Sequence, residues 1–158
     1  KRVPFMCGSI PENYIALQWR EYNTTERLQL LEWLFMESEY KNNLGWCIID
    51  GIVDFVKDFN DRIECKQITE KLMKYTSINN CAVTCMLHLN PGSEKMRGHL
   101  GTILGQKCEM VAMVKNEGDY STVICKRVRG GKPFKTFTIR IDRDWMPYVS
   151  QDNQDSII

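Results

Sequence analysis

The chain has 158 residues and carries 21 basic and 20 acidic side chains, for a formal charge of +1. Its length is that of a single domain with a genuine core. No run reaches the roughly 18 apolar residues of a membrane span, and Lys1-Arg2 is not followed by the apolar region of a signal peptide. We therefore expect a cytoplasmic protein that does not bind membranes.

The cysteines indicate reduced, buried thiols. Their number is odd, no two form a C-x-x-C pair, and several lie within apolar runs. The two histidines, His88 and His99, have no zinc-ligand spacing to them, which argues against a zinc site. The seven thiols are those of Cys7, Cys47, Cys65, Cys81, Cys85, Cys108 and Cys125.

The first elements are a strand and a helix. Residues 1–13 predict irregular backbone, and Tyr14 to Trp19 (YIALQW) then predicts a strand. Asn23 and Glu26 have the spacing of a helix-capping box, so a helix should begin there, run to about Tyr40 and cover the sheet. Its apolar face is formed by Leu30, Leu31, Leu34 and Phe35.

A central strand is predicted at Trp46 to Ile49 (WCII), ending on Asp50-Gly51. The run is apolar without helical spacing, which is typical of a buried strand. Ligands bind at the C-terminal ends of strands in open α/β sheets, and Mg²⁺ is usually held by one or two carboxylates together with phosphate oxygens. Asp50 is therefore a candidate magnesium ligand, although the same pattern is also typical of an aspartate that caps a helix.

A loop containing Asp54, Asp58 and Asp61 leads to a second predicted helix, from about Arg62 to Ile78. Asp61 and Glu64 are placed to cap its N-terminus. Its buried stripe is predicted to consist of Ile68, Leu72 and Tyr75.

Another interior strand is predicted over residues 81–90, CAVTCMLHLN, because both of its faces are mostly apolar. It ends at His88 and Asn90, which places an imidazole and an amide at the same edge of the sheet as Asp50. Because a histidine at a strand end is more often structural than functional, both interpretations stay open.

Glycines at positions 92, 98, 101 and 105 surround Arg97 and His99, with Lys107 close behind. So many glycines predict a mobile or ligand-shaped loop that leads into a short helix.

The last part of the chain predicts β-structure. A strand alternates from Met110 to Val114, a turn follows at residues 116–119, and two antiparallel strands span Ser121 to Val128 and Phe134 to Ile141. Residues 151–158 should form a flexible tail.

Positive charge is concentrated in this last part. Residues 1–80 hold 10 basic and 12 acidic side chains, whereas residues 81–158 hold 11 and 8. The densest stretch predicts a hairpin with a Gly130-Gly131 turn and cations on both arms, suited either to DNA phosphates or to the protection of a solvated sheet edge. The cations are Lys126, Arg127, Arg129, Lys132 and Lys135.

This order of elements predicts a mostly parallel α/β sheet flanked by helices, with an antiparallel C-terminal hairpin. Three segments carry a family resemblance: IALQWREYNTTERLQLLEWL, WCIIDGIVDFVKDFND and MLHLNPGSEKMRGHLGTILGQKCEMVAMVK. They resemble the RecA-like ATPase core, of P-loop NTPase type, of hexameric DnaB- or RepA-type helicase proteins of bacterial plasmids and mobile elements. The motifs IDG-x-x-D, LH-x-N and RGHLGT follow in that order, and the resemblance covers roughly residues 3–147.

The resemblance implies an ATP and Mg²⁺ site. Asp50 matches the Walker B aspartate that orders the magnesium ion. His88 and Asn90 match the catalytic sensor position that responds to the γ-phosphate.

The resemblance also implies contacts with DNA and with other subunits. Such proteins form rings, hexamers in the full-length form, that act on single-stranded DNA without sequence preference. The loop that faces the ring's channel is matched by Arg97, Gly98, His99 and Gly101. A basic finger that reaches the neighbouring subunit's nucleotide is matched by Lys115, with Arg97 and Lys107 as competing candidates.

The chain departs from the family in lacking its phosphate loop. No G-x-x-x-x-G-K-[ST] motif occurs, and no strand with a catalytic glutamate precedes Asp50. Because the chain also begins with Lys1, where the family's second strand would have ended, residues 1–150 are interpreted as the C-terminal portion of a RecA-like ATPase domain. The sheet would then have a gap between the strands ending at His88 and Val114.

Three functions are compatible with these features. The first is part of a ring-forming, ATP-dependent DNA motor used in replication or mobilisation of a mobile element. The second is a non-catalytic DNA-binding module with a vestigial RecA-like fold, and the third is an assembly subunit.

Overall fold

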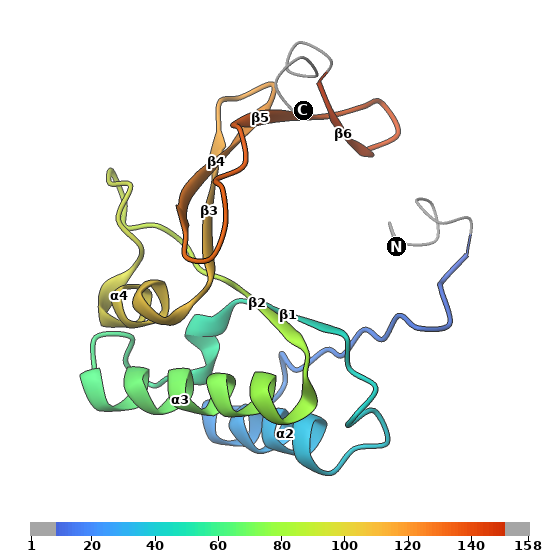
Figure 1. Cartoon of the computed structure of the whole chain (residues 1–158), viewed down its shortest axis with the longest axis vertical. Coiled ribbons are helices and arrows are strands. Elements are labelled where there is room, and N and C mark those ends of the chain that lie inside the picture. Colours follow the sequence, from blue (N-terminus) through green and yellow to red (C-terminus); the bar gives the residue numbers. More distant parts are fainter. Residues whose placement is uncertain (1–8, 151–158) are drawn as a thin grey trace. The chain divides into compact units, whose positions relative to one another are not determined.

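The computed structural model describes residues 9–150, which divide into two compact units (Figure 1). We call residues 18–107 the helical unit, and residues 9–17 together with 108–150 the sheet unit. The predicted tail and Cys7 lie outside the described residues. Within residues 9–150 no helix is long and apolar enough to cross a membrane.

The helical unit begins with α2, Thr24–Met36, which has the predicted capping box. The Asn23 side chain accepts hydrogen bonds from the backbone N–H groups of Thr25 and Glu26, and the Glu26 carboxylate accepts one from the Asn23 N–H at 2.8 Å. The helix ends four residues before the predicted Tyr40, because the Ser38 hydroxyl donates to the Leu34 carbonyl and its N–H turns back to the Trp33 carbonyl. On its apolar face Leu31, Leu34 and Phe35 are buried, whereas Leu30 is only half-buried.

Two parallel strands, β1 (Trp46–Asp50) and β2 (Ala82–Met86), form the sheet of this unit. The bounds of β1 agree with prediction, whereas β2 ends at Met86, four residues before the predicted Asn90. Neither strand is buried on both faces. Ile49 is buried, while Trp46 and Ile48 are exposed, so the helices cover only one face of the sheet. The prediction of fully buried strands is therefore wrong, because burial on both faces would require a second layer of helices on the other side of the sheet.

The 18-residue helix α3, Arg62–Asn79, connects these strands. Asp61 caps it by accepting hydrogen bonds from the N–H groups of Ile63 and Glu64, as predicted. The helix ends at Asn80, which adopts the left-handed conformation at φ 48°. The predicted stripe of Ile68, Leu72 and Tyr75 is buried, and it packs beside α2 through a stacked pair of rings, Phe35 and Tyr75, 4.9 Å apart.

A third helix, α4 (Gly98–Lys107), packs against α3. With the short 3₁₀ helix η1, Ile52–Phe55, it completes the apolar core, to which Ile52 and Leu100 contribute with no exposed surface. All members of this core belong to the helical unit.

The sheet unit contains four antiparallel strands in the order β3-β4-β5-β6: Met110–Asn116, Ser121–Val128, Phe137–Ile141 and Pro147–Val149. The first two agree with prediction. The third begins at Phe137 rather than Phe134, and β6 was not predicted. Among the described residues of this unit there is no helix.

Three predictions about strand pairing are wrong. Tyr14 to Trp19 is not a strand, because its backbone has no neighbour to form a ladder with, and Tyr14, Ile15 and Leu17 are largely exposed. The sheet predicted to be mostly parallel has only two parallel strands. β3 pairs antiparallel with β4 instead of joining them.

The predicted Gly130-Gly131 hairpin is also wrong. β4 pairs with β5 only from Ser121 to Val123, so residues 129–136 form a wide connection rather than a tight turn. On its other side β4 pairs with β3 from Ser121 to Val128, and the Arg129 N–H continues this contact by donating to the Glu109 carbonyl at 2.8 Å.

Candidate functional site

Asp50 lies at the C-terminal tip of β1, beside Met86 at the tip of β2. Two buried isoleucines, Ile49 before it and Ile52 after it, fix the backbone on both sides, while the Asp50 side chain is exposed. The Asp50-Gly51 peptide is cis. The chain thus anchors a carboxylate at the strand edge where α/β sheets bind ligands.

The Asp50 carboxylate does not cap a helix. The N-cap of η1 is Gly51, with no side-chain capping bond, and within residues 9–150 Asp50 makes no hydrogen bond or ion pair. The acidic residues that follow are all engaged. Asp54 pairs with Arg27 at 3.4 Å, Asp58 accepts from the Asn60 N–H, Asp61 caps α3, and Glu64 accepts from the Lys57 and Asp58 N–H groups.

His88 follows β2 by two residues, so it lies at the same edge of the sheet as Asp50. Its side chain is exposed and makes no hydrogen bond within the described residues. Its carbonyl accepts a hydrogen bond from the Arg97 N–H at 3.2 Å, which closes a loop over residues 88–97.

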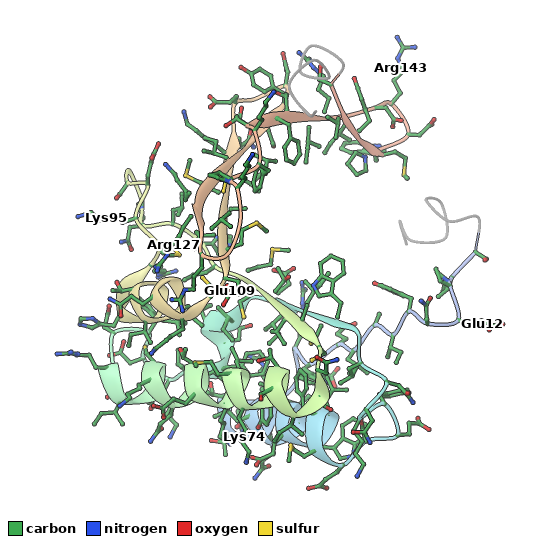
Figure 2. The ribbon with its side chains drawn as sticks, viewed as in Figure 1. Glu12, Lys74, Lys95, Glu109, Arg127 and Arg143 are labelled. Atoms are coloured by element: carbon green, nitrogen blue, oxygen red, sulfur yellow. The ribbon has the colours of Figure 1, made fainter. Side chains whose placement is uncertain are left out.

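Asn90 maintains the shape of this loop. Its N–H donates to the Lys95 carbonyl at 2.9 Å, and its carbonyl accepts from the Ser93 N–H. The side-chain amide of Asn90 donates to the Met96 carbonyl at 3.5 Å, which is a weak contact. The loop tip carries Lys95, which projects outward (Figure 2). Asn90 therefore shapes the loop mainly through its backbone, and its role as a phosphate sensor stays a prediction.

Arg97 packs against the protein. Its guanidinium lies 4.4 Å from the centre of the Phe59 ring, and its side chain is half-buried. His99, two residues on, is exposed. Both flank Gly98, at which α4 begins, so the predicted channel loop is helical from Gly98 onward.

The glycines serve internal packing rather than the approach of a ligand. A Cβ at Gly98, which has φ +64°, would lie 2.6 Å from the Phe59 ring. A Cβ at Gly101 or Gly105 would overlap Met96. The predicted loop leading into a short helix is confirmed, with α4 as the helix, and Gly98, Gly101 and Gly105 allow α4 to cross closely over that loop. The mobility of the loop stays a prediction.

Lys107 lies in the last turn of α4. Ten helical residues extend about 15 Å, so the helix separates Lys107 from the edge that holds Asp50 and His88. Lys115, the other finger candidate, belongs to β3 in the sheet unit and pairs with Glu117 at 2.9 Å. Within the helical unit, the structure therefore does not bring Lys107 into the site around Asp50.

The cations predicted to contact DNA are distributed over β4 and the connection that follows. Lys126 is the extra residue at a β-bulge of β4, because the register pairs Arg127 with Val111 and Cys125 with Ala112. Figure 2 shows Arg127 and Glu109 at the same end of the β3–β4 pair. Arg129, Lys132 and Lys135 lie on the connection between β4 and β5.

Two side-chain contacts around the site were not predicted from the sequence. Phe59 holds Arg97, and Arg27 joins the Trp19 carbonyl to Asp54. Neither partner follows from spacing in the sequence, because each contact joins separate elements.

No protein-family model matches the chain, and no curated protein matches it.

Proposed function

We propose that the chain supplies the magnesium-binding strand edge and part of the DNA-binding surface of an ATP-dependent DNA motor of the RecA-like helicase kind. The observation that carries the proposal is that the Asp50 carboxylate is exposed and has no partner within residues 9–150. It is the one carboxylate between residues 50 and 64 without a partner among the described residues, and it lies at a parallel strand tip.

Asp50 fits a magnesium ion in this role. Within residues 9–150 no three His, Cys, Asp or Glu side chains gather as metal ligands, so a metal ion held by protein groups alone is not supported. Mg²⁺ that retains waters and phosphate oxygens needs only one or two carboxylates. Bound Mg²⁺-ATP would supply the phosphoryl chemistry, Asp50 would hold the ion, and His88 would lie beside the phosphates.

The phosphate grip of this ATPase class comes mainly from loop amides and a loop lysine. Since the 158 residues contain no such loop, the proposal requires another segment or chain to supply it. The chain alone should bind Mg²⁺-ATP weakly and hydrolyse it negligibly.

Paramagnetic Mn²⁺-ATP provides the test. In NMR spectra of the chain it should broaden the amide signals of Gly51 and His88, because both lie at the edge that holds Asp50. Asp50→Asn should abolish the broadening without loss of stability, since the side chain is exposed. Asp119→Asn, at an exposed carboxylate in the sheet unit, is the matched control and should change nothing.

Two results would contradict the nucleotide site. One is broadening that persists in Asp50→Asn. The other is robust ATP turnover by the purified chain that Asp50→Asn leaves intact. Unfolding of Asp50→Ala would show instead that the carboxylate has a structural role.

A non-catalytic DNA-binding module is the second candidate. The hydrogen bond from the Asn90 side chain to the Met96 carbonyl favours it, because a residue expected to face the nucleotide contacts its own loop instead. DNA binding without any Mn²⁺-ATP broadening would select this candidate.

A further inference from the structure

The two faces of the sheet unit differ in chemistry. Strand register places Val114, Val123 and Phe137 on one face, which is apolar. The opposite face carries Lys115, Thr122 and Thr138, which are neighbours across three strands, and beside them the apolar pair Met113 and Ile124. Residues on the same strand two positions apart share a face, so Arg140 and its cross-strand partner Tyr148 extend this second face.

Three planar side chains form a row across this second face. The Arg140 guanidinium lies 5.4 Å from the centre of the Tyr120 ring, and Arg140 pairs across the strands with Tyr148. Tyr120 is 37% exposed and Tyr148 is 48% exposed, so both rings present surface to solvent. We call Tyr120, Arg140 and Tyr148 the tyrosine–arginine row.

The strands of this unit carry charge of one sign, and the acidic residues near the row lie in the turns that join them: Glu117, Asp119, Asp142 and Asp144. β3, β4, β5 and β6 contain no aspartate or glutamate, and their charged residues are Lys115, Lys126, Arg127 and Arg140. Glu117 in the β3–β4 turn pairs with Lys115 and offsets part of this charge. A sheet face that combines exposed aromatic rings with cations complements a flexible polyanion whose bases can stack.

We propose that the tyrosine–arginine row binds single-stranded DNA, with bases stacked on Tyr148 and Tyr120 and the backbone phosphates near Arg140 and Lys115. The preference for single strands follows from the surface, because the bases of a duplex are stacked on each other and cannot reach the rings. The choice of DNA over RNA rests on the proposed function. Cross-strand stabilisation of the sheet is the competing role, and it predicts loss of stability rather than loss of binding.

Fluorescence anisotropy of a labelled oligothymidine, measured with the full chain at several salt concentrations, tests the row. Tyr148→Ala should weaken binding by about tenfold, since stacking on one aromatic ring contributes a factor of that order. Tyr148→Phe keeps the ring and should bind as the wild type does. Arg140→Lys keeps the charge but loses the planar group, so it should weaken binding at an almost unchanged salt slope. Tyr22→Ala, at a tyrosine of similar exposure in the helical unit, is the matched control.

The outcomes separate the row from the proposed motor. If Tyr148→Ala and Arg140→Lys bind DNA as the wild type does, the row is overturned. In that case, loss of binding in a triple variant would still support DNA binding by β4 and the connection that follows it. The triple variant is Arg127→Glu, Arg129→Glu, Lys132→Glu. If the chain binds a DNA duplex as tightly as the single strand, base stacking on the row is overturned. If it binds an RNA oligomer more tightly than the DNA oligomer, the choice of DNA is overturned. Loss of Mn²⁺-ATP broadening leaves the row standing, because the row contains no part of the nucleotide site. Unchanged thermal unfolding of Tyr148→Ala would exclude the structural explanation.

Discussion

The helical unit and the sheet unit are held together in different ways. In the helical unit, three helices cover one face of two parallel strands and enclose a continuous apolar core. In the sheet unit, four strands are joined by backbone ladders, and among its described residues only Met113, Val123 and Ser150 are buried. The comparison teaches that side-chain packing dominates the stability of one unit, whereas cross-strand hydrogen bonding dominates that of the other.

The largest expected effect tests whether the two units unfold separately. Leu31→Ala removes a side chain that is 1% exposed, and it should lower the free energy of unfolding of the helical unit by about 3 kcal/mol. Hydrogen exchange followed by mass spectrometry should show faster exchange in α2 and α3 with no change in β4 and β5.

The reciprocal variant completes this comparison. Val123→Ala should cost about 1.5 kcal/mol, from two buried methyl groups, and should speed exchange only in the sheet unit. Equal acceleration in both units for either variant would contradict their separation and show one cooperative structure.

The difference between the units also explains which predictions were correct. α2 and α3 have local signals, the Asn23 cap and the Asp61 cap, and these signals lie within a few residues of the helix they start. Pairing is not local. The residues of β3 have the alternation expected of a strand, but nothing in that alternation says whether the neighbour is β2 or β4.

The candidate site divides in the same way. Its anchor, Asp50 at the end of an apolar run, could be placed at a strand tip from the sequence alone, and so could His88 at the same edge. That Asp50 has no partner among the described residues could not be predicted, because it depends on where every other side chain lies. The same holds for Arg97, whose partner Phe59 lies on a different loop.

The tyrosine–arginine row could not be found from the sequence for a related reason. Arg140 contacts Tyr120, a residue 20 positions earlier, and pairs with Tyr148 across a turn that was not predicted. That turn is closed by the Asp142 side chain, which accepts hydrogen bonds from the N–H groups of Asp144 and Met146. Figure 2 shows Arg143 projecting outward from it.

A smaller effect on stability is expected from substitutions of the glycines in α4, and it tests how tightly the helical unit is packed. Gly101→Ala should lower the free energy of unfolding by about 1–2 kcal/mol, because the added Cβ would overlap the Met96 Cβ and approach its backbone carbon to 2.9 Å. Gly105→Ala meets only the flexible end of the Met96 side chain, and alanine is the better helix former by about 1 kcal/mol. It should therefore be neutral or slightly stabilising.

Urea unfolding of the two glycine variants provides the measurement. Each introduces the same single methyl group into the same helix, so the difference between them reports the contacts of residue 101 with the Met96 backbone and with Leu87. Two variants of equal stability would show that α4 shifts to accommodate a side chain, and that its crossing over residues 88–97 is not tightly packed.

The smallest expected effect concerns the Tyr75 hydroxyl, a polar group inside the packed core. Tyr75 is 1% exposed, and its hydroxyl has no hydrogen-bond partner among the described residues. A buried polar group without a partner costs about 1 kcal/mol or more. Tyr75→Phe keeps the ring stacked on Phe35 and removes the hydroxyl, so it should raise the free energy of unfolding by about 1 kcal/mol.

The pH dependence of stability gives this variant an internal control. Burial raises the pKa of Tyr75 above its ordinary value. The folded state therefore holds the phenol proton more tightly than the unfolded state, and this contribution to stability is complete below about pH 10 and is lost as the pH rises through the folded-state pKa. Wild-type stability measured by urea unfolding should fall above about pH 10 more steeply than that of Tyr75→Phe. Parallel pH profiles, or a loss of stability in Tyr75→Phe at pH 7, would show that the hydroxyl is satisfied within the core, and that packing there includes a polar contact.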